Sequence, residues 1–158
     1  MTLQEFYIWC EKTPIGVALQ TNTYPFPVIE AVHLLTITLM LGTLFVINFR
    51  VLGFVLKDRP LSEVVAGITP WMRTGYVLTL LTGIVLFMSE SLKLSANAAW
   101  LPKMGMLVGA MVFQFVLSAF ILKGSQLEKP TGLAKTLAVV STLLWIVTGM
   151  AARWIAFV

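Results

Sequence analysis

Long apolar runs alternate with short polar stretches along this chain. Four runs, at about residues 28–56, 71–88, 103–122 and 134–157, fall within or above the roughly 17–25 helical residues that cross a bilayer core. Their apolar positions do not alternate with polar ones, which favours helices over the strands of a membrane barrel. The pattern predicts an all-α integral membrane four-helix bundle, with residues 1–158 forming a single membrane domain.

A shorter amphipathic segment precedes the first run. Over residues 2–12, Leu3, Phe6, Tyr7 and Cys10 recur at helical spacing among polar neighbours. The segment is too short and too polar to span a bilayer, so we predict an N-terminal amphipathic helix lying in the membrane interface. Cys10 is interpreted as a small buried thiol, and a single cysteine excludes an internal disulfide.

Composition supports lipid as the main partner of this chain. Hydrophobic residues make up 58% of it and charged residues 11%, with a mean hydropathy of +0.90. A soluble domain carries about 25% charged residues. The net charge of +4 reflects lysines and arginines that set membrane orientation. The basic loops are too short to bind nucleic acid.

The distribution of Lys and Arg predicts the orientation. The connections between spans one and two and between spans three and four, with their flanks, carry seven of these residues, whereas the opposite side carries four. The seven are Arg50, Lys57, Arg59, Arg73, Lys123, Lys129 and Lys135; the four are Lys12, Lys93, Lys103 and Arg153. The excess is expected on the cytoplasmic side. We therefore predict a multi-pass protein of the bacterial inner membrane with both termini in the periplasm.

Ionisable side chains gather at the predicted outer end of the bundle. Glu30 and His33, the only histidine, share one helix face at i, i+3 spacing. Glu90, Lys103 and Arg153 bring charges to the same end from the other three spans. Charged groups within a membrane turn toward the bundle interior and find partners. One interpretation is a salt-bridged rim, with Lys103 and Arg153 as a polar cluster and His33 as a structural histidine.

The other interpretation treats Glu30 and His33 as a site. Glu-x-x-His is a spacing found among di-iron ligands, for which His33, Glu30 and Glu90 would be the metal-binding set, although such sites need two of these motifs. His33 could instead be an axial ligand of haem b or a copper ligand, with Glu30 as a tentative partner. A third alternative is a proton relay in which Glu30 fixes the tautomer of His33. A chain without any cofactor is the favoured alternative.

Other features indicate helix packing rather than catalysis. Gly105 and Gly109 form a G-x-x-x-G motif in the third span, which permits close helix contact within the bundle or between copies. Gln114 lies near the middle of the same span, where it should hydrogen-bond to another helix. No nucleophile elbow, phosphate loop, dinucleotide fingerprint or H-E-x-x-H motif is present, so we assign no catalytic residues.

Several short motifs, taken together, resemble a family of small bacterial four-helix membrane proteins of unknown function. They are Tyr24-Pro25, Glu30-x-x-His33, Gly42-Thr43 and Arg50-x-Leu52-Gly53, with Lys103 at the head of the third span; the likeness covers about residues 5–122. That family is distantly similar to copper-resistance-D-like membrane domains and to b-type cytochromes. The resemblance implies a haem or copper site at the outer face. Members often carry a further histidine late in span three, where this chain has Gln114 and Ser118.

These observations order three functional hypotheses. The first is an integral membrane accessory or anchoring subunit of a larger bacterial assembly, such as an electron-transfer one, bound to other membrane subunits or to itself. The second is a haem b- or copper-binding membrane redox protein that uses His33. The third is a small proton-coupled channel or carrier. The shortage of catalytic groups beside many packing surfaces favours the first, and a non-enzymatic role.

Overall fold

Six α-helices make up the part of the chain that the computed structural model describes, residues 2–121 and 129–154. Four of them are long and apolar enough to cross a membrane. This confirms the predicted all-α bundle with four spans. In chain order the helices are α1 (Leu3–Glu11), α2 (Pro14–Thr21), α3 (Pro25–Leu52), α4 (Leu61–Ser95), α5 (Trp100–Ile121) and α6 (Gly132–Trp154).

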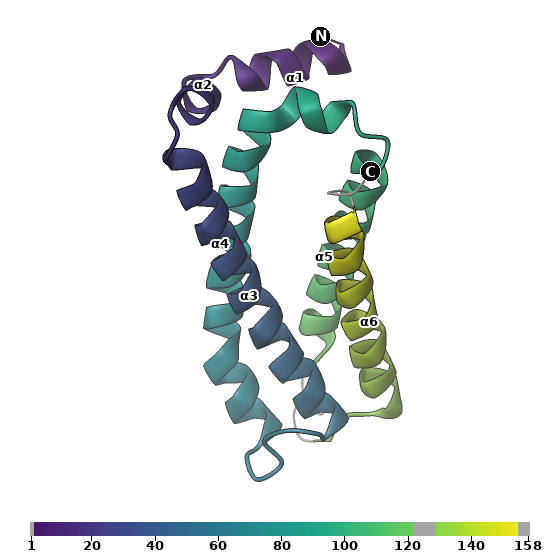
Figure 1. Cartoon of the computed structure of the whole chain (residues 1–158). Helices are drawn as coiled ribbons and strands as arrows, with labels where there is room; N and C mark the ends of the chain where they lie inside the picture. The colour runs from purple at the N-terminus through teal and green to yellow at the C-terminus, as the bar shows by residue number, and fades with distance from the viewer. Residues whose placement is uncertain (1, 122–128, 155–158) are drawn as a thin grey trace.

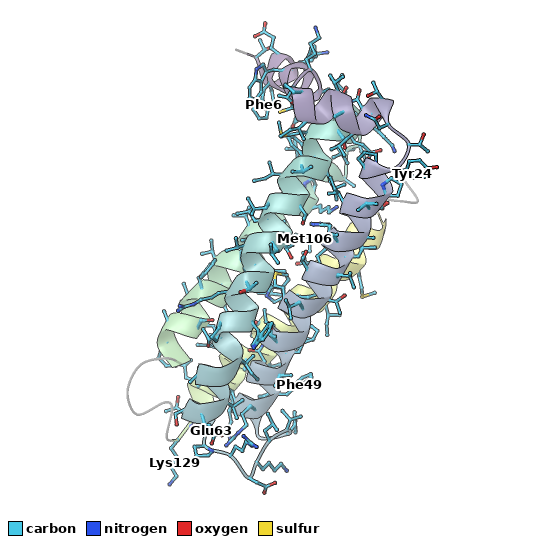
Figure 2. The ribbon with its side chains drawn as sticks, turned by 90° about the vertical axis from the view of Figure 1, so that its left-hand side faces the viewer. Phe6, Tyr24, Phe49, Glu63, Met106 and Lys129 are labelled. Atoms are coloured by element: carbon cyan, nitrogen blue, oxygen red, sulfur yellow. The ribbon has the colours of Figure 1, made fainter. Side chains whose placement is uncertain are left out.

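The spans form an elongated bundle of two antiparallel pairs (Figure 1). Helix α3 packs along α4, α5 packs along α6, and α3 also contacts α6. Helices α1 and α2 lie across one end, which we call the capped end, and the connection at residues 53–60 marks the opposite, loop end. Figure 2 shows Phe6 and Tyr24 near the capped end and Glu63 and Lys129 near the loop end.

Local sequence signals account for most helix boundaries. Thr2 caps α1 in a capping box with Glu5, and the Thr13 hydroxyl accepts a hydrogen bond from the amide of Gly16 at the start of α2. Helix α3 is capped by Gly53, whose φ of +80° is the left-handed conformation that glycine adopts without steric cost. The chain therefore stops the first span at Leu52, short of the expected end near residue 56.

The amphipathic segment continues further than the sequence suggested. Sequence analysis predicts one helix over about residues 2–12, whereas the structure has a second helix, α2, which begins directly after Thr13. Pro14 stands in its first turn, where the missing amide hydrogen has no helical partner to lose. The proline thus starts a helix here rather than ending the segment.

Helix α4 is longer at both ends than the expected span. It begins at Leu61 and continues through Pro70, which sequence analysis places in a loop. The neighbouring Val65 and Met72 are buried in the core, so packing holds the helix together where proline removes a backbone hydrogen bond. Beyond the expected end at residue 88, Glu90 leaves helical geometry with φ of −128°, and α4 changes direction to run beneath α1 (Figure 1).

The core runs along the inner faces of α3 and α4. Leu44 and Val51 of α3 are almost fully buried, and they belong to one cluster with Tyr76 of α4, Leu117 of α5 and Trp145 of α6. Many large apolar side chains on the outer faces are exposed instead. A folded chain with this much apolar surface outside suits lipid rather than water as its solvent.

Candidate functional site

His33 faces α4 and is held there by a threonine. Its Nδ1 lies 2.7 Å from Oγ1 of Thr82, and the Thr82 hydroxyl itself donates to the carbonyl oxygen of Leu78 at 2.7 Å. When the Thr82 hydroxyl gives its one hydrogen to the Leu78 carbonyl, Nδ1 is the donor to Thr82. The neutral ring therefore carries its proton on Nδ1 and leaves the Nε2 lone pair free to accept a hydrogen bond or bind a metal.

A glycine makes room for the imidazole ring. A Cβ atom built on Gly83 would lie 3.2 Å from Cε1 of His33, so any larger residue there would press on the ring. Glu30, the expected partner of His33, is exposed and makes no hydrogen bond or ion pair with the described residues. In the structure, Thr82 rather than Glu30 makes the hydrogen bond that fixes the His33 tautomer.

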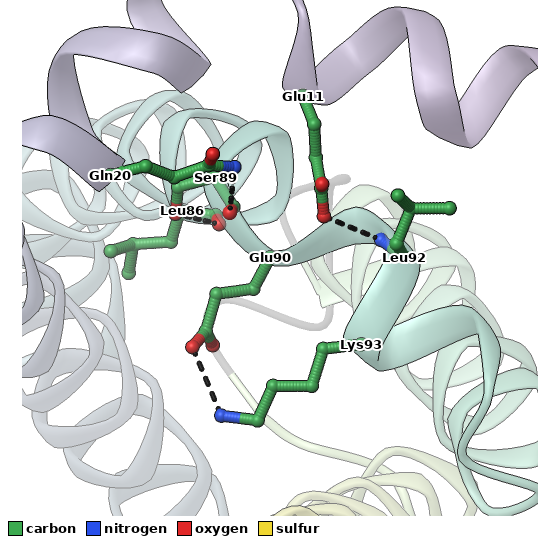
Figure 3. A network of polar contacts seen from close by, with 7 residues as sticks. All are labelled: Glu11, Gln20, Leu86, Ser89, Glu90, Leu92 and Lys93. Carbon is green, nitrogen blue, oxygen red and sulfur yellow. Dashed lines mark hydrogen bonds and ion pairs between the residues drawn. The ribbon is translucent and has the colours of Figure 1, made fainter.

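Glu90 belongs to the bend of α4 rather than to the histidine. Its carboxylate accepts a charge-assisted hydrogen bond from Nζ of Lys93 at 3.0 Å (Figure 3). Around the bend, the Glu11 carboxylate accepts from the amide of Leu92, and Nε2 of Gln20 donates to the carbonyl of Ser89, both at 2.8 Å. Helices α1 and α2 therefore satisfy backbone groups that the bend of α4 exposes.

Lys103 is the positively charged residue that interacts with the histidine site. Its Nζ lies 5.5 Å from the centroid of the Trp100 ring, which stacks on Phe87 of α4. Lys103 and Glu30 both act on His33 through their charges. The Arg153 side chain, the other member of the expected polar cluster, lies outside the described residues. The structure therefore brings Thr82, Lys103 and Glu30 to the region of His33 and leaves Glu90 with Lys93.

The described residues contain no group of three or more His, Cys, Asp or Glu side chains that could hold a metal ion. His33, Glu30 and Glu90 accordingly do not form the three-ligand set considered from the sequence within one copy of the described chain. Cys10 is a buried residue of α1, and burial raises the pKa of its thiol above the ordinary value. The thiol thus has the inert character expected of a packing residue.

Gln114, in the third span, takes part in a buried polar network between helices. Gln114 accepts a hydrogen bond from the Ser141 hydroxyl of α6 at 2.5 Å. Nδ2 of Asn48 donates to the hydroxyls of Ser141 and Thr142 at 3.1 Å, which joins α3, α5 and α6 through one buried polar network. The sequence expectation for this network names Gln114 but not Asn48, although an asparagine inside an apolar run is itself a signal of a helix contact.

Gly105 and Gly109 do not contact another helix of the described chain. Both are exposed, and a Cβ atom on either would meet nothing within 4 Å. The close contact that G-x-x-x-G permits is therefore absent inside this single copy, where the α5 pairing with α6 uses another face of the helix.

Fold and composition define the class of this protein: an integral membrane protein built on a four-span helical bundle. A model of a family of unknown function, DUF6644, matches residues 6–158, and the chain belongs to that family. No curated protein and no solved structure matches the chain. Neither the family description nor these searches attach a reaction, ligand or partner to the fold.

Proposed function

We propose that this protein is an accessory or anchoring subunit of a larger membrane assembly, bound to a partner through α5. The observation that carries the proposal is the outward position of Gly105 and Gly109. Two glycines at i, i+4 spacing leave a shallow groove in which the backbone of another helix can approach closely. In a chain with no described catalytic cluster, that groove is the feature best suited to a specific contact.

The groove is flanked by apolar side chains on the same face of α5. Leu101, Val108, Val112 and Val116 recur at helical spacing around the two glycines, and all four are exposed. In lipid, helices associate through van der Waals packing and small-residue contacts rather than through the hydrophobic effect. This face offers both, with two glycines beside exposed valines, so a membrane-spanning helix of another subunit is the partner it suits.

Extraction from native membranes tests this proposal. Lipid-nanodisc extraction without detergent should recover the chain together with another membrane protein, identified by mass spectrometry. Gly109→Leu should abolish co-migration while leaving the fold intact, because position 109 is exposed and a Cβ atom there meets nothing within 4 Å. Met150→Leu, at an exposed position on α6, is the matched control. A lone monomer from native membranes, or unchanged co-migration of Gly109→Leu, would contradict the proposal.

A second candidate function, haem or copper binding at His33, is favoured by the free Nε2 of its ring. The Nδ1 contact with Thr82 is the kind of orienting hydrogen bond that metal-bound histidines make through their other nitrogen. The described residues of one copy offer no second histidine, so a haem would be held by one protein ligand or by a ligand from another chain. His33 is therefore suited to be one ligand of a haem or a copper ion. The other ligands would have to come from a partner chain.

An absorption spectrum of the purified protein separates the two candidates. The subunit proposal predicts no Soret band and no copper by elemental analysis in the isolated chain. A Soret band that disappears in both His33→Ala and His33→Gln, and weakens in Thr82→Val, would establish the cofactor function instead. Thr82→Val removes only the hydroxyl that fixes the ring tautomer, so it tests the geometry rather than the ligand itself.

A further inference from the structure

A pocket of about 490 Å³ lies between α4 and α5, away from the histidine site and from the glycine groove. Its wall is mostly apolar but includes several groups that can donate hydrogen bonds. The lining residues are Thr69, Met72, Arg73, Tyr76 and Val77 of α4 with Gln114, Phe115, Ser118 and Ala119 of α5. The pocket volume falls within the roughly 300–1,000 Å³ typical of small-molecule sites.

Arg73 places a permanent positive charge inside α4, one of the four helices that are long and apolar enough to cross a membrane. Sequence analysis assigns it to the flank of a loop, but α4 begins at Leu61 and the charged residues that bracket Arg73 on this helix are Glu63 and Glu90. At 1.5 Å per residue, Arg73 lies about 15 Å along the helix from the first and about 25 Å from the second. Charged side chains within apolar membrane helices usually pair with another group or line a cavity.

No partner for Arg73 is found among the described residues. It makes no hydrogen bond or ion pair there, and its side chain is exposed at the edge of the pocket. One helical turn away, the Tyr76 ring packs against Phe115 and Trp145, and the residue is only 7% exposed. Its hydroxyl is buried and has no hydrogen-bond partner. Arg73 and Tyr76, from adjacent turns of α4, thus line the same pocket, and neither polar group has an acceptor among the described residues.

The geometry points to an acidic amphiphile as the ligand of this pocket. We propose that an anionic head group, a carboxylate or a phosphate, binds the Arg73 guanidinium and accepts a second hydrogen bond from the Tyr76 hydroxyl. Guanidinium is suited to such groups because it presents several donors in one plane. The acyl chain lies against Met72, Val77 and Phe115. A pocket of this volume accommodates a chain and a head group, whereas a whole partner helix is far larger.

Spin-labelled stearate added to the purified full-length protein in phosphatidylcholine nanodiscs tests this inference. The wild-type protein should give an immobilised electron paramagnetic resonance component that unlabelled oleate displaces. Arg73→Gln should weaken binding about ten- to a hundredfold, the usual effect of losing a hydrogen-bonded charge. Arg59→Gln is the matched control, because it removes the same charge from the loop end, where Arg59 pairs with Glu63.

Tyr76→Phe keeps the test valid if Arg73→Gln fails to fold. It removes only an unpartnered buried hydroxyl, so the protein should remain as stable as wild type or become more stable, while stearate binding weakens. Unchanged binding in a folded Arg73→Gln protein would overturn the proposal. So would equal binding of the uncharged methyl ester of the labelled acid, or a folded wild-type protein that binds no amphiphile.

Two further probes distinguish the sources of the head group. Spin-labelled phosphatidylglycerol should compete with stearate if a lipid phosphate is accepted, whereas a site specific for free carboxylates excludes it. Labelled phosphatidylcholine, with no net charge, serves as the reference for unspecific lipid contact. If Arg73→Gln instead removes a co-purifying membrane protein and the wild-type pocket retains no acidic amphiphile, the guanidinium serves a partner chain and the proposal fails.

Discussion

We expect Gly75→Ala to reduce the stability of the bundle by about 1–3 kcal/mol, the usual cost of overpacking a buried contact. A Cβ atom at position 75 would lie 2.9 Å from both Cα and N of Met40 on α3. These are backbone atoms, so no side-chain rotation relieves the clash and α3 must move away from α4. The two helices share the longest contact in the bundle, which makes this the most sensitive glycine of the spans.

Titration of the purified protein with sodium dodecyl sulfate, followed by tryptophan fluorescence, measures this effect as a lower unfolding midpoint. Gly67→Ala is the matched control because it lies on the same helix and its new Cβ meets nothing within 4 Å. That control should be neutral or stabilising by up to about 1 kcal/mol, since alanine is the better helix former. Equal midpoints for the two variants would show that α3 does not lie against Gly75.

The second large effect is expected from Gly16→Ala at the capped end. A Cβ atom at position 16 would lie 2.7 Å from the carbonyl oxygen of Glu11 and 2.9 Å from those of Cys10 and Met88. Three backbone segments meet at this glycine, so alanine should separate α2 from α4. The hydrogen bonds from Gln20 to Ser89 and from Leu92 to Glu11 would be lost with that contact.

Cys10 reports this opening because it is only 3% exposed in the folded chain. Burial raises the pKa of its thiol, so at neutral pH the wild-type protein holds less reactive thiolate than a free cysteine, and labelling accelerates only at higher pH. Opening removes both protections, and a water-soluble maleimide should react roughly ten- to a hundredfold faster in Gly16→Ala. Gly42→Ala, with no atom within 4 Å of its Cβ, should label as slowly as wild type. Similar rates in both variants would contradict the docked position of α2.

The number and class of the spans followed from the sequence because hydropathy over a whole helix is a strong signal in lipid. The two ends of α4 could not be predicted from the sequence. Pro70 is a local helix breaker that burial of its neighbours overrides, and the bend at Glu90 is supported by hydrogen bonds from α1 and α2, more than sixty residues away in the chain. Local patterns contain no information about contacts at that separation.

The candidate site, too, could be predicted from the sequence only in part. That His33 turns toward the bundle was predictable from its place in an apolar helix, but its partner was not, because Thr82 comes from another span and a threonine in a membrane helix usually bonds to its own backbone. The expected span at residues 71–88 puts Arg73 in its first turn, on the flank of a connection, whereas α4 begins at Leu61 and carries Arg73 in its interior. Had the helix start been recognised, an arginine at that depth would itself have indicated a functional site.

Photo-crosslinking in intact membranes tests most directly whether α5 binds another protein. A photoreactive amino acid replaces Gly109 in one variant and Met150, an exposed position on α6, in another. We expect position 109 to yield one discrete crosslinked protein on irradiation, and position 150 to yield lipid adducts or a diffuse background. Lipid adducts at both positions would show that the glycine face of α5 is covered by lipid alone, and would contradict the proposed subunit function.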